Sequence, residues 1–406
     1  MEFETFTLSN GLRFVHKRVK SAVAYCGLTV NVGTRDELEH EHGMAHFLEH
    51  MFFKGTKKRS SLRISSLLES RGGDLNAFTT KEETAVHAVV LRGDLSKAFD
   101  IISDIVFNPT FPPAELEKEK AVVCDEINLY LDNPSDTIFD EFEKMMFPAS
   151  SLGRSILGSA SSLYSFSQQG VQSFVNRCYT TDRMVFSSVG SFGVERVARL
   201  AAKYFAHLPG SVAQIRREPL SGYSVFGKEC RKSTHQAHCL LGNRAFDYAH
   251  DSRFALHLLV NLLGGPSQNS RLSLALRETH GLAYGVEVAS TLYSDCGVTT
   301  VYFGTEKNSV EKCLRVVDEE LEKLRSDKLT PAQLRLAKRQ MLGQILIGSE
   351  SNEHTMLNMG KSLLAYGKVN SSKEIEERIR AVTAEQVQEL ACEIFNPKKM
   401  SSLIYR

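Results

Sequence analysis

His46-Phe47-Leu48-Glu49-His50 is the stretch of sequence from which the fold and the chemistry of this chain can be worked out. Neither proline nor glycine interrupts residues 44–54, so we expect a helix there, and in a helix residues four apart share a face. His46 and His50 would then bind one metal ion. Glu49 would lie close enough to hold a metal-bound water rather than the metal itself. The order His-x-x-Glu-His is the inverse of the zinc motif His-Glu-x-x-His. The alternative is two surface histidines on an ordinary helix.

A catalytic zinc site would need one more residue, because such sites use three protein ligands and leave the fourth position to water. A helix is expected from Ala114 to about Tyr130, after a pair of prolines. It carries the acids Glu115, Glu117, Glu119, Asp125 and Glu126. Glu119 and Glu126 are two turns apart on one face of that helix. Most acids on such a helix are simply solvated, so the helix alone does not select a ligand.

The second half of the chain repeats the first, which indicates two copies of one α/β unit. Residues 45–55 align with residues 255–265, and residues 113–116 align with residues 331–334, which again open a long helix. In the second copy Leu256, Leu259 and Val260 replace His46, Glu49 and His50, Ala337 replaces Glu119, and Gln344 replaces Glu126. The acids disappear together with the histidines, which favours Glu126 as the third ligand. The alternative is a chance likeness between amphipathic helices.

The length of the chain, 406 residues, exceeds what one hydrophobic core usually serves, so two domains are expected. Residues 207–223 contain Pro209, Gly210, Pro219 and Gly222 and have the composition of a linker. We therefore expect a metal-bearing unit over residues 1–206 and a homologous metal-free unit over residues 224–406.

Composition argues against several classes of partner. The formal net charge is +1 and the basic residues are scattered, so no surface for nucleic acid or an anionic membrane is expected. The longest apolar run, residues 254–263, is interrupted by His257 and Asn261 and is far too short to span a membrane. The N-terminus lacks a signal-peptide pattern, and the eight cysteines show no paired spacing. These features predict a cytoplasmic protein in a reducing compartment.

Two segments resemble the motif helices of the pitrilysin and mitochondrial processing peptidase family of zinc endopeptidases. Residues 46–56 are similar to the family's first motif helix, and residues 117–126 are similar to its second. Glu126 follows His50 at the spacing at which the family places its glutamate ligand. Glu119 matches a glutamate that supports the site from behind the metal.

Two further segments resemble parts of the family that contact the substrate. One is similar to an edge strand to which an extended peptide adds by main-chain hydrogen bonds, here Asn76, Ala77, Phe78 and Thr79. The other, residues 277–284, is similar to a second-half segment whose Arg and Tyr, here Arg277 and Tyr284, reach the substrate near the scissile bond. It departs from the family at Thr279-His280, where an Arg-Gly-type sequence is commoner, although neither position carries chemistry. Without the resemblance, Arg277 would be taken as a surface guanidinium and Tyr284 as a core phenol.

The resemblance implies an α+β fold and a mechanism. Two homologous α/β units would each contain a mostly antiparallel sheet of about six strands covered by helices. One zinc ion per chain would be held by His46, His50 and Glu126, with Glu49 as the general base for cleavage of extended or unfolded peptides. Longer family members fuse four such units, so this two-unit chain is expected to form a homodimer whose subunits enclose a chamber.

Two other classes of protein use the same features differently. S-ribosylhomocysteine lyases carry His-x-x-Glu-His and bind iron, but they resemble one unit of this fold, and the twofold length and the position of Glu126 argue against them. Non-catalytic relatives serve as scaffold or peptide-binding subunits. Those relatives typically lose motif residues, whereas this chain keeps all of them.

Overall fold

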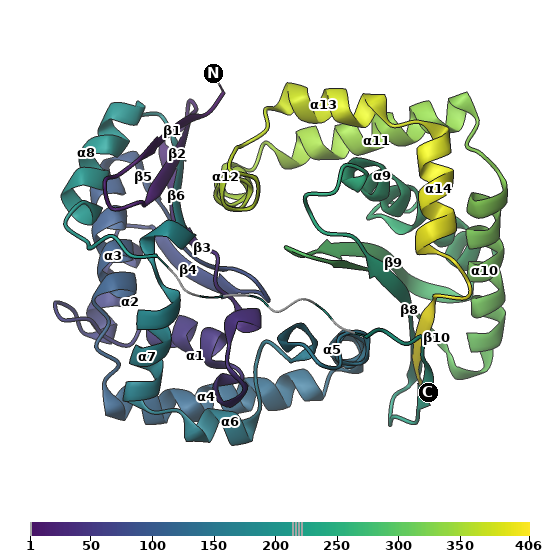
Figure 1. The fold of residues 1–406 in the computed structure, drawn as a ribbon, viewed down its shortest axis with the longest axis horizontal. Helices are drawn as coiled ribbons and strands as arrows, with labels where there is room; N and C mark the ends of the chain where they lie inside the picture. Colours follow the sequence, from purple (N-terminus) through teal and green to yellow (C-terminus); the bar gives the residue numbers. More distant parts are fainter. Residues whose placement is uncertain (1, 213–214, 216, 218–219, 221) are drawn as a thin grey trace. The chain divides into compact units, whose positions relative to one another are not determined.

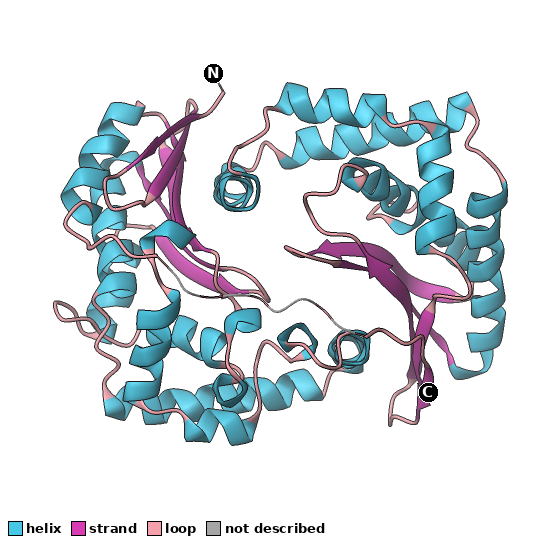
Figure 2. Cartoon of the chain, viewed as in Figure 1, coloured by secondary structure: helices cyan, strands magenta, loops and turns pink. Residues whose placement is uncertain are grey.

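The computed structural model of the chain describes residues 2–212, 215, 217, 220 and 222–406. They fold into two compact units, each of which combines one β-sheet with helices (Figure 1 and Figure 2). The first unit comprises Met1–Leu129, Ser150–Glu218 and Gly348–Ser371, and the second comprises Tyr130–Ala149, Pro219–Ile347 and Ser372–Arg406. Each unit takes in a segment from the other half of the chain, whereas the division predicted at residues 207–223 assumed two continuous units.

The sheet of the first unit has six strands: β1 (Glu4–Thr7), β2 (Arg13–Arg18), β3 (Val23–Val30), β4 (Asp74–Thr79), β5 (Thr84–Leu91) and β6 (Met184–Gly190). Their order is β1-β2-β6-β3-β5-β4, and β2 and β6 are the one parallel pair in this sheet. Alternate residues of β3 and β5 are buried and apolar, as expected for strands that lay one face on a core. β4 lies at the edge of the sheet.

Helices cover one face of this sheet and enclose its core. The helix α3 (Leu95–Phe107) packs on β3 and β5, and α8 (Val194–Phe205) packs on α3 and β2. Phe14, Phe99, Phe186 and Phe205 form a fully buried aromatic cluster, in which the ring centroids of Phe99 and Phe186 are 4.3 Å apart. Each such side chain contributes about 1.5–3 kcal/mol by leaving water.

The opposite face is covered by α12 (Asn352–Tyr366), a helix from the C-terminal half of the sequence. It packs on β6, β3 and β2 (Figure 1). Met356, Met359 and Leu363 form its apolar contact with the sheet. Gly360 permits the close approach, because a Cβ atom at this position would lie 2.6 Å from Oγ1 of Thr29.

The sheet of the second unit has five strands: β7 (Gly227–Cys230), β8 (Gln236–Ala245), β9 (Ala283–Leu292), β10 (Gly297–Glu306) and β11 (Ser401–Tyr405). Their order is β7-β11-β8-β10-β9, and only the pair β7 and β11 is parallel. The helix α5 (Pro134–Met146), from the N-terminal half, packs on β8 and β11. Glu141 of α5 accepts hydrogen bonds of 2.7 Å from the Tyr405 hydroxyl and the Lys228 ammonium. The predicted class, two α/β units with mostly antiparallel sheets, is confirmed.

The internal repeat is visible as pairs of equivalent helices. The helices α1 (Met44–Met51) and α4 (Pro113–Leu131) correspond to α9 (Arg253–Gly264) and α11 (Pro331–Gly348). Each of α5 and α12 follows the long helix of its own half and then joins the unit built mainly from the other half. The remaining α-helices are α2 (Ser61–Glu69), α6 (Ala160–Ser165), α7 (Gln168–Cys178), α10 (Val310–Ser326), α13 (Ser372–Ala381) and α14 (Ala384–Ile394). In the part of the chain that the structure describes, no helix is long and apolar enough to cross a membrane.

Candidate metal centre

The motif helix α1 is fixed to the first unit at its N-terminus and along one face. The buried carboxylate of Glu37 accepts hydrogen bonds from the main-chain N–H groups of Gly43 (2.9 Å) and Ala45 (2.8 Å), which have no partner within the helix. Gly43 has φ of +91° and lies so close to Gly158 that a Cβ atom would come within 2.7 Å of it. The apolar residues of α1 are buried. Of the motif residues, His46 is buried as well, whereas Glu49 and His50 are half-buried.

Three potential ligand atoms converge beside α1. One ligand atom from each of His46, His50 and Glu126 can be chosen so that all three lie within 4.8 Å of one another. His46 Nε2 lies 3.6 Å from one oxygen of Glu126, and His50 Nε2 lies 3.5 Å from the other. Ligand atoms about 2 Å from a tetrahedral zinc are roughly 3.3 Å apart, so these residues fit a zinc ion. Among the described residues, this is the one such group of three or more His, Cys, Asp or Glu side chains.

Glu119 supports the second histidine from behind. His50 Nδ1 lies 2.8 Å from one carboxylate oxygen of Glu119, and the Lys54 ammonium lies 2.6 Å from the other. Burial opposes ionisation of Glu119, but the hydrogen bonds from His50 and Lys54 outweigh it and hold the pKa of Glu119 below its usual value. With Nδ1–H donating to Glu119, the Nε2 lone pair of His50 is left for a metal.

The two histidines differ in their affinity for protons. Burial, followed by the neighbouring His50, lowers the pKa of His46 to about 4, so that His46 is neutral and ready to act as a ligand at neutral pH. Burial also disfavours the charged form of His50, but the bond to Glu119 and the charges of Glu119 and Glu126 raise its pKa. The surroundings therefore shift the pKa values of the two histidines in opposite directions.

Glu49 stands beside these ligands without joining the group. Burial raises the pKa of its carboxyl group and the charge of Glu126 adds to the rise, while the side chain of Thr79 and the charge of His50 oppose it. A raised pKa makes the carboxylate a stronger base, which favours the proton transfer of a general base.

The predicted edge-strand residues lie next to the motif helix. Asn76, Ala77, Phe78 and Thr79 belong to β4, which pairs only with β5 within the described sheet and contacts α1. No strand among the described residues pairs with its other edge, to which an extended peptide could add as a strand. Behind it, His87 of β5 pairs with Glu353 of α12 at 3.1 Å.

Arg277 and Tyr284 lie in the second unit and not in the unit that holds the candidate metal ligands. Arg277 belongs to a π-helical segment, Ser273–Thr279, and its guanidinium lies over the ring of Tyr284 at 5.5 Å. Tyr284 is 83% exposed, so it is not a core phenol.

In the second copy of the motif, the buried Leu256 and Val260 fill the positions of the histidines.

Lys54 and Glu37 were missed in the sequence, although each had a signal there. Lys54 is four residues after His50 and would share its helix face if the helix predicted over residues 44–54 were continuous. In the structure α1 ends at Met51, and Lys54 reaches Glu119 from the turn that follows. Glu37 precedes the motif helix, but its contact with Gly43 and Ala45 depends on how the intervening residues turn back. No local pattern encodes that turn.

The chain matches the model of a family described as insulinase (peptidase family M16) over residues 13–160, and a model described as the peptidase M16 inactive domain over residues 165–341. It is 35% identical to the uncharacterized zinc protease YmxG of Bacillus subtilis, over 98% of this chain and 97% of the relative. It is 35% identical to the uncharacterized zinc protease Rv2782c of Mycobacterium tuberculosis, over 95% and 89%.

Two solved structures share the fold. One is a protease from Helicobacter pylori, with a TM-score of 0.91 and 20% identity over 100% of this chain and 99% of that chain. The other is described as a peptidase M16 inactive domain from Pseudomonas fluorescens, with a TM-score of 0.92 and 20% identity over 100% and 98%.

Proposed function

The chain belongs to peptidase family M16, as a short member with two units. We propose that it is a zinc endopeptidase that cuts extended or unfolded peptides. The relatives named above are called zinc proteases. The observation that carries the proposal is the convergence of His46, His50 and Glu126, together with Glu119 behind His50. These residues would hold one zinc ion per chain.

The chain's own residues account for the proposed chemistry. A bound zinc ion would lower the pKa of a water molecule and polarise the peptide carbonyl. Glu49 takes the proton of the attacking water and passes it to the leaving amine. Glu119 and Lys54 keep His50 in the tautomer that binds metal. The substrate pairs along β4 by main-chain hydrogen bonds, which places its backbone beside α1.

We also infer the oligomeric state of the protein and its compartment. In the fused four-unit relatives, the metal motif and the Arg/Tyr segment come from different halves of the molecule. We therefore propose a homodimer that encloses a chamber, with Arg277 and Tyr284 of one subunit reaching the substrate at the metal site of the other. We also propose a cytoplasmic location, because the eight cysteines show no paired spacing.

The second candidate is a non-catalytic, peptide-binding or scaffold subunit. One observation favours it: the second family model, over residues 165–341, is described as an inactive domain. That stretch includes α9, where leucine and valine replace the histidines, whereas the first unit keeps every motif residue.

Glu49→Gln tests the proposed function. We expect this variant to bind as much zinc as the wild type and to hydrolyse a quenched peptide about a hundredfold or more slowly, since general-base catalysis contributes 10²–10⁴-fold. Glu117→Gln is the matched control, because the Glu117 side chain is 69% exposed on α4. Equal activity of the Glu49→Gln variant and the wild type would refute the general base. An inactive wild type that binds zinc and peptide would favour the non-catalytic subunit.

A further inference from the structure

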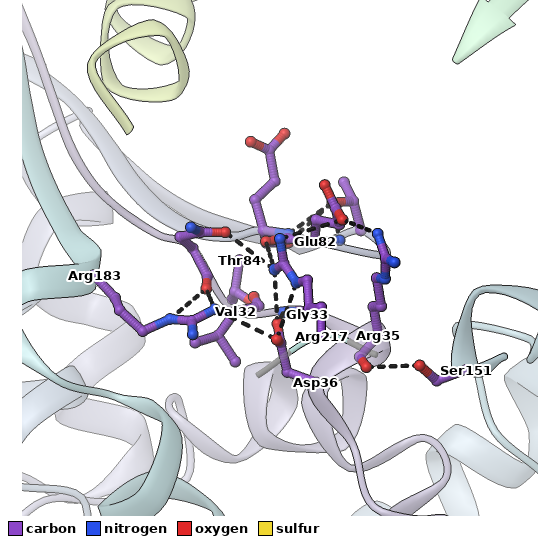
Figure 3. A network of polar contacts seen from close by, with 12 residues as sticks. Val32, Gly33, Arg35, Asp36, Glu82, Thr84, Ser151, Arg183 and Arg217 are labelled. Atoms are coloured by element: carbon purple, nitrogen blue, oxygen red, sulfur yellow. Dashed lines mark hydrogen bonds and ion pairs between the residues drawn. The ribbon is translucent and has the colours of Figure 1, made fainter. Parts of the chain in front are cut away.

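Arg217 lies in the stretch that the sequence predicts to be a linker, yet it belongs to a buried ionic network of the first unit (Figure 3). Its guanidinium binds both oxygens of Asp36, at 3.1 and 2.9 Å. The same guanidinium lies 3.2 Å from a carboxylate oxygen of Glu82 and donates to the Glu82 carbonyl at 3.3 Å. The Asp36 side chain is fully buried, and those of Arg217 and Glu82 are 14% and 13% exposed. The planar fork of an arginine suits such a double contact.

The two acids belong to the two elements that the proposed reaction must bring together. Asp36 is next to Glu37, whose carboxylate holds the N-terminus of α1. Glu82 lies in the turn between the edge strand β4 and β5. Arg217 therefore ties the approach to the metal-binding helix to the end of the strand on which the substrate would lie.

The backbone between these elements is already in close contact. The main-chain N–H of Arg35 donates to the Lys81 carbonyl at 2.8 Å, and that of Thr34 donates to the Thr80 carbonyl at 3.2 Å. A Cβ atom on Gly33 would lie 2.3 Å from the Thr80 carbonyl oxygen. Two arginine side chains bridge this backbone contact as well, because Arg35 lies 2.6 Å from the same carboxylate oxygen of Glu82 that Arg217 approaches. Of these two, Arg217 is the one that also binds Asp36 through both carboxylate oxygens.

We propose that Arg217 is a positioning residue for peptide cleavage: it fixes the register between the peptide on β4 and the water held at α1. This inference rests on the proposed function. A shift of about 1 Å away from the chemistry can lower a rate about a hundredfold, because the reacting atoms must approach along a defined line. Loss of Arg217 would then slow turnover while leaving both the metal site and the peptide-binding edge in place.

Arg183 provides the matched control. Its guanidinium lies 3.4 Å from Asp36 and donates from Nε to the Asn31 carbonyl at 2.7 Å. It thus binds the Asp36 side of the network, whereas Arg217 also reaches Glu82 on the other side. Arg183→Met and Arg217→Met both remove a buried cation from Asp36, so both should lower the melting temperature.

The test measures zinc content, melting temperature, kcat and KM of both variants on a quenched peptide. For Arg217→Met we expect wild-type zinc content, KM within about threefold and kcat reduced about tenfold or more, whereas Arg183→Met should keep kcat within about threefold. Glu82→Gln removes the ion pairs of Glu82 with both Arg217 and Arg35, so it should lower kcat at least as much as Arg217→Met, and adding Arg217→Met to it should lower kcat no further. If Arg217→Met does not fold, Arg217→Lys replaces it with the same expected result, because a lysine keeps the cation but lacks the planar fork that binds Asp36 and Glu82 together.

Three results would overturn the inference. One is a kcat of Arg217→Met close to that of the wild type, and another is an equal loss of kcat in both arginine variants. The third is a further loss of kcat when Arg217→Met is added to Glu82→Gln. Each would mean that Arg217 only stabilises the fold. An inactive wild-type protein would refute the proposed function first and this inference with it, and so can be told apart from these results.

Discussion

Glu126 and Glu119 stand on one helix face but differ in surroundings and hence in role. The Glu126 side chain is 43% exposed and faces both histidines, whereas that of Glu119 is 5% exposed and holds His50 and Lys54. The sequence places both acids on this face, and their distances to the histidines show which of them can be a ligand. Lys54 was missed, because its spacing from His50 is a signal but does not identify Glu119, which is far along the chain, as its partner.

We expect Glu126→Gln to lose zinc on dialysis, because it removes one of three ligands. Glu119→Gln should still bind zinc, with affinity lowered about 10–100-fold, as is typical when the partner of a ligating histidine is changed. Metal content by atomic emission and a chelator competition measure both effects. Zinc content of the Glu126→Gln variant equal to that of the wild type would rule out this ligand.

Edge strand β4 and helix α12 border the sheet of the first unit, β4 at one edge and α12 on one face. The family resemblance predicted residues 76–79 as an edge strand, whereas no prediction was made for the helix α12. The sheet that α12 covers could not be predicted, because its apolar residues would suit any sheet of this kind. Gly360 and Thr29 become neighbours only when distant parts of the chain meet.

Peptide addition to β4 predicts a dependence on alternate main-chain amides of the substrate, because a strand pairs with its neighbour through every second residue on that side. We expect a substrate N-methylated at the pairing amides to be cut at least about tenfold more slowly. The same peptide methylated at the intervening amides is the control and should be cut almost normally. Equal rates for both peptides would exclude strand addition.

Docking of α12 predicts opposite effects for two glycine-to-alanine changes. Gly360→Ala should destabilise the protein by about 1–3 kcal/mol, the usual range for overpacking, because its Cβ atom would meet Thr29. Gly343→Ala in α11 has nothing within 4 Å of the new Cβ and should stabilise by about 0.5–1 kcal/mol through helix propensity. Urea unfolding measures both. If Gly360→Ala left the free energy of unfolding unchanged, α12 would pack less closely on the sheet than the position of Thr29 indicates.

In the proposed homodimer, each active site would combine the metal ligands of one chain with Arg277 and Tyr284 of the other. A Glu49→Gln chain and a Tyr284→Phe chain should each be nearly inactive alone. In a mixed dimer, one site carries both changes and the other carries none, so activity should return to about half that of the wild type per dimer. Co-expression with two different affinity tags isolates the mixed dimer. A purified mixed dimer as inactive as its parents would show that Tyr284 does not act across the interface.

The exchanged helices also bear on how the protein is made. During synthesis, the strands of the first unit leave the ribosome long before α12, which begins at Asn352. Until then, the sheet face that buries Val15, Val185 and Val189 lacks its cover. Contacts this distant in sequence slow folding and leave apolar surface open to chaperones or to aggregation. The first unit can therefore complete its fold only after most of the second half of the sequence has been translated.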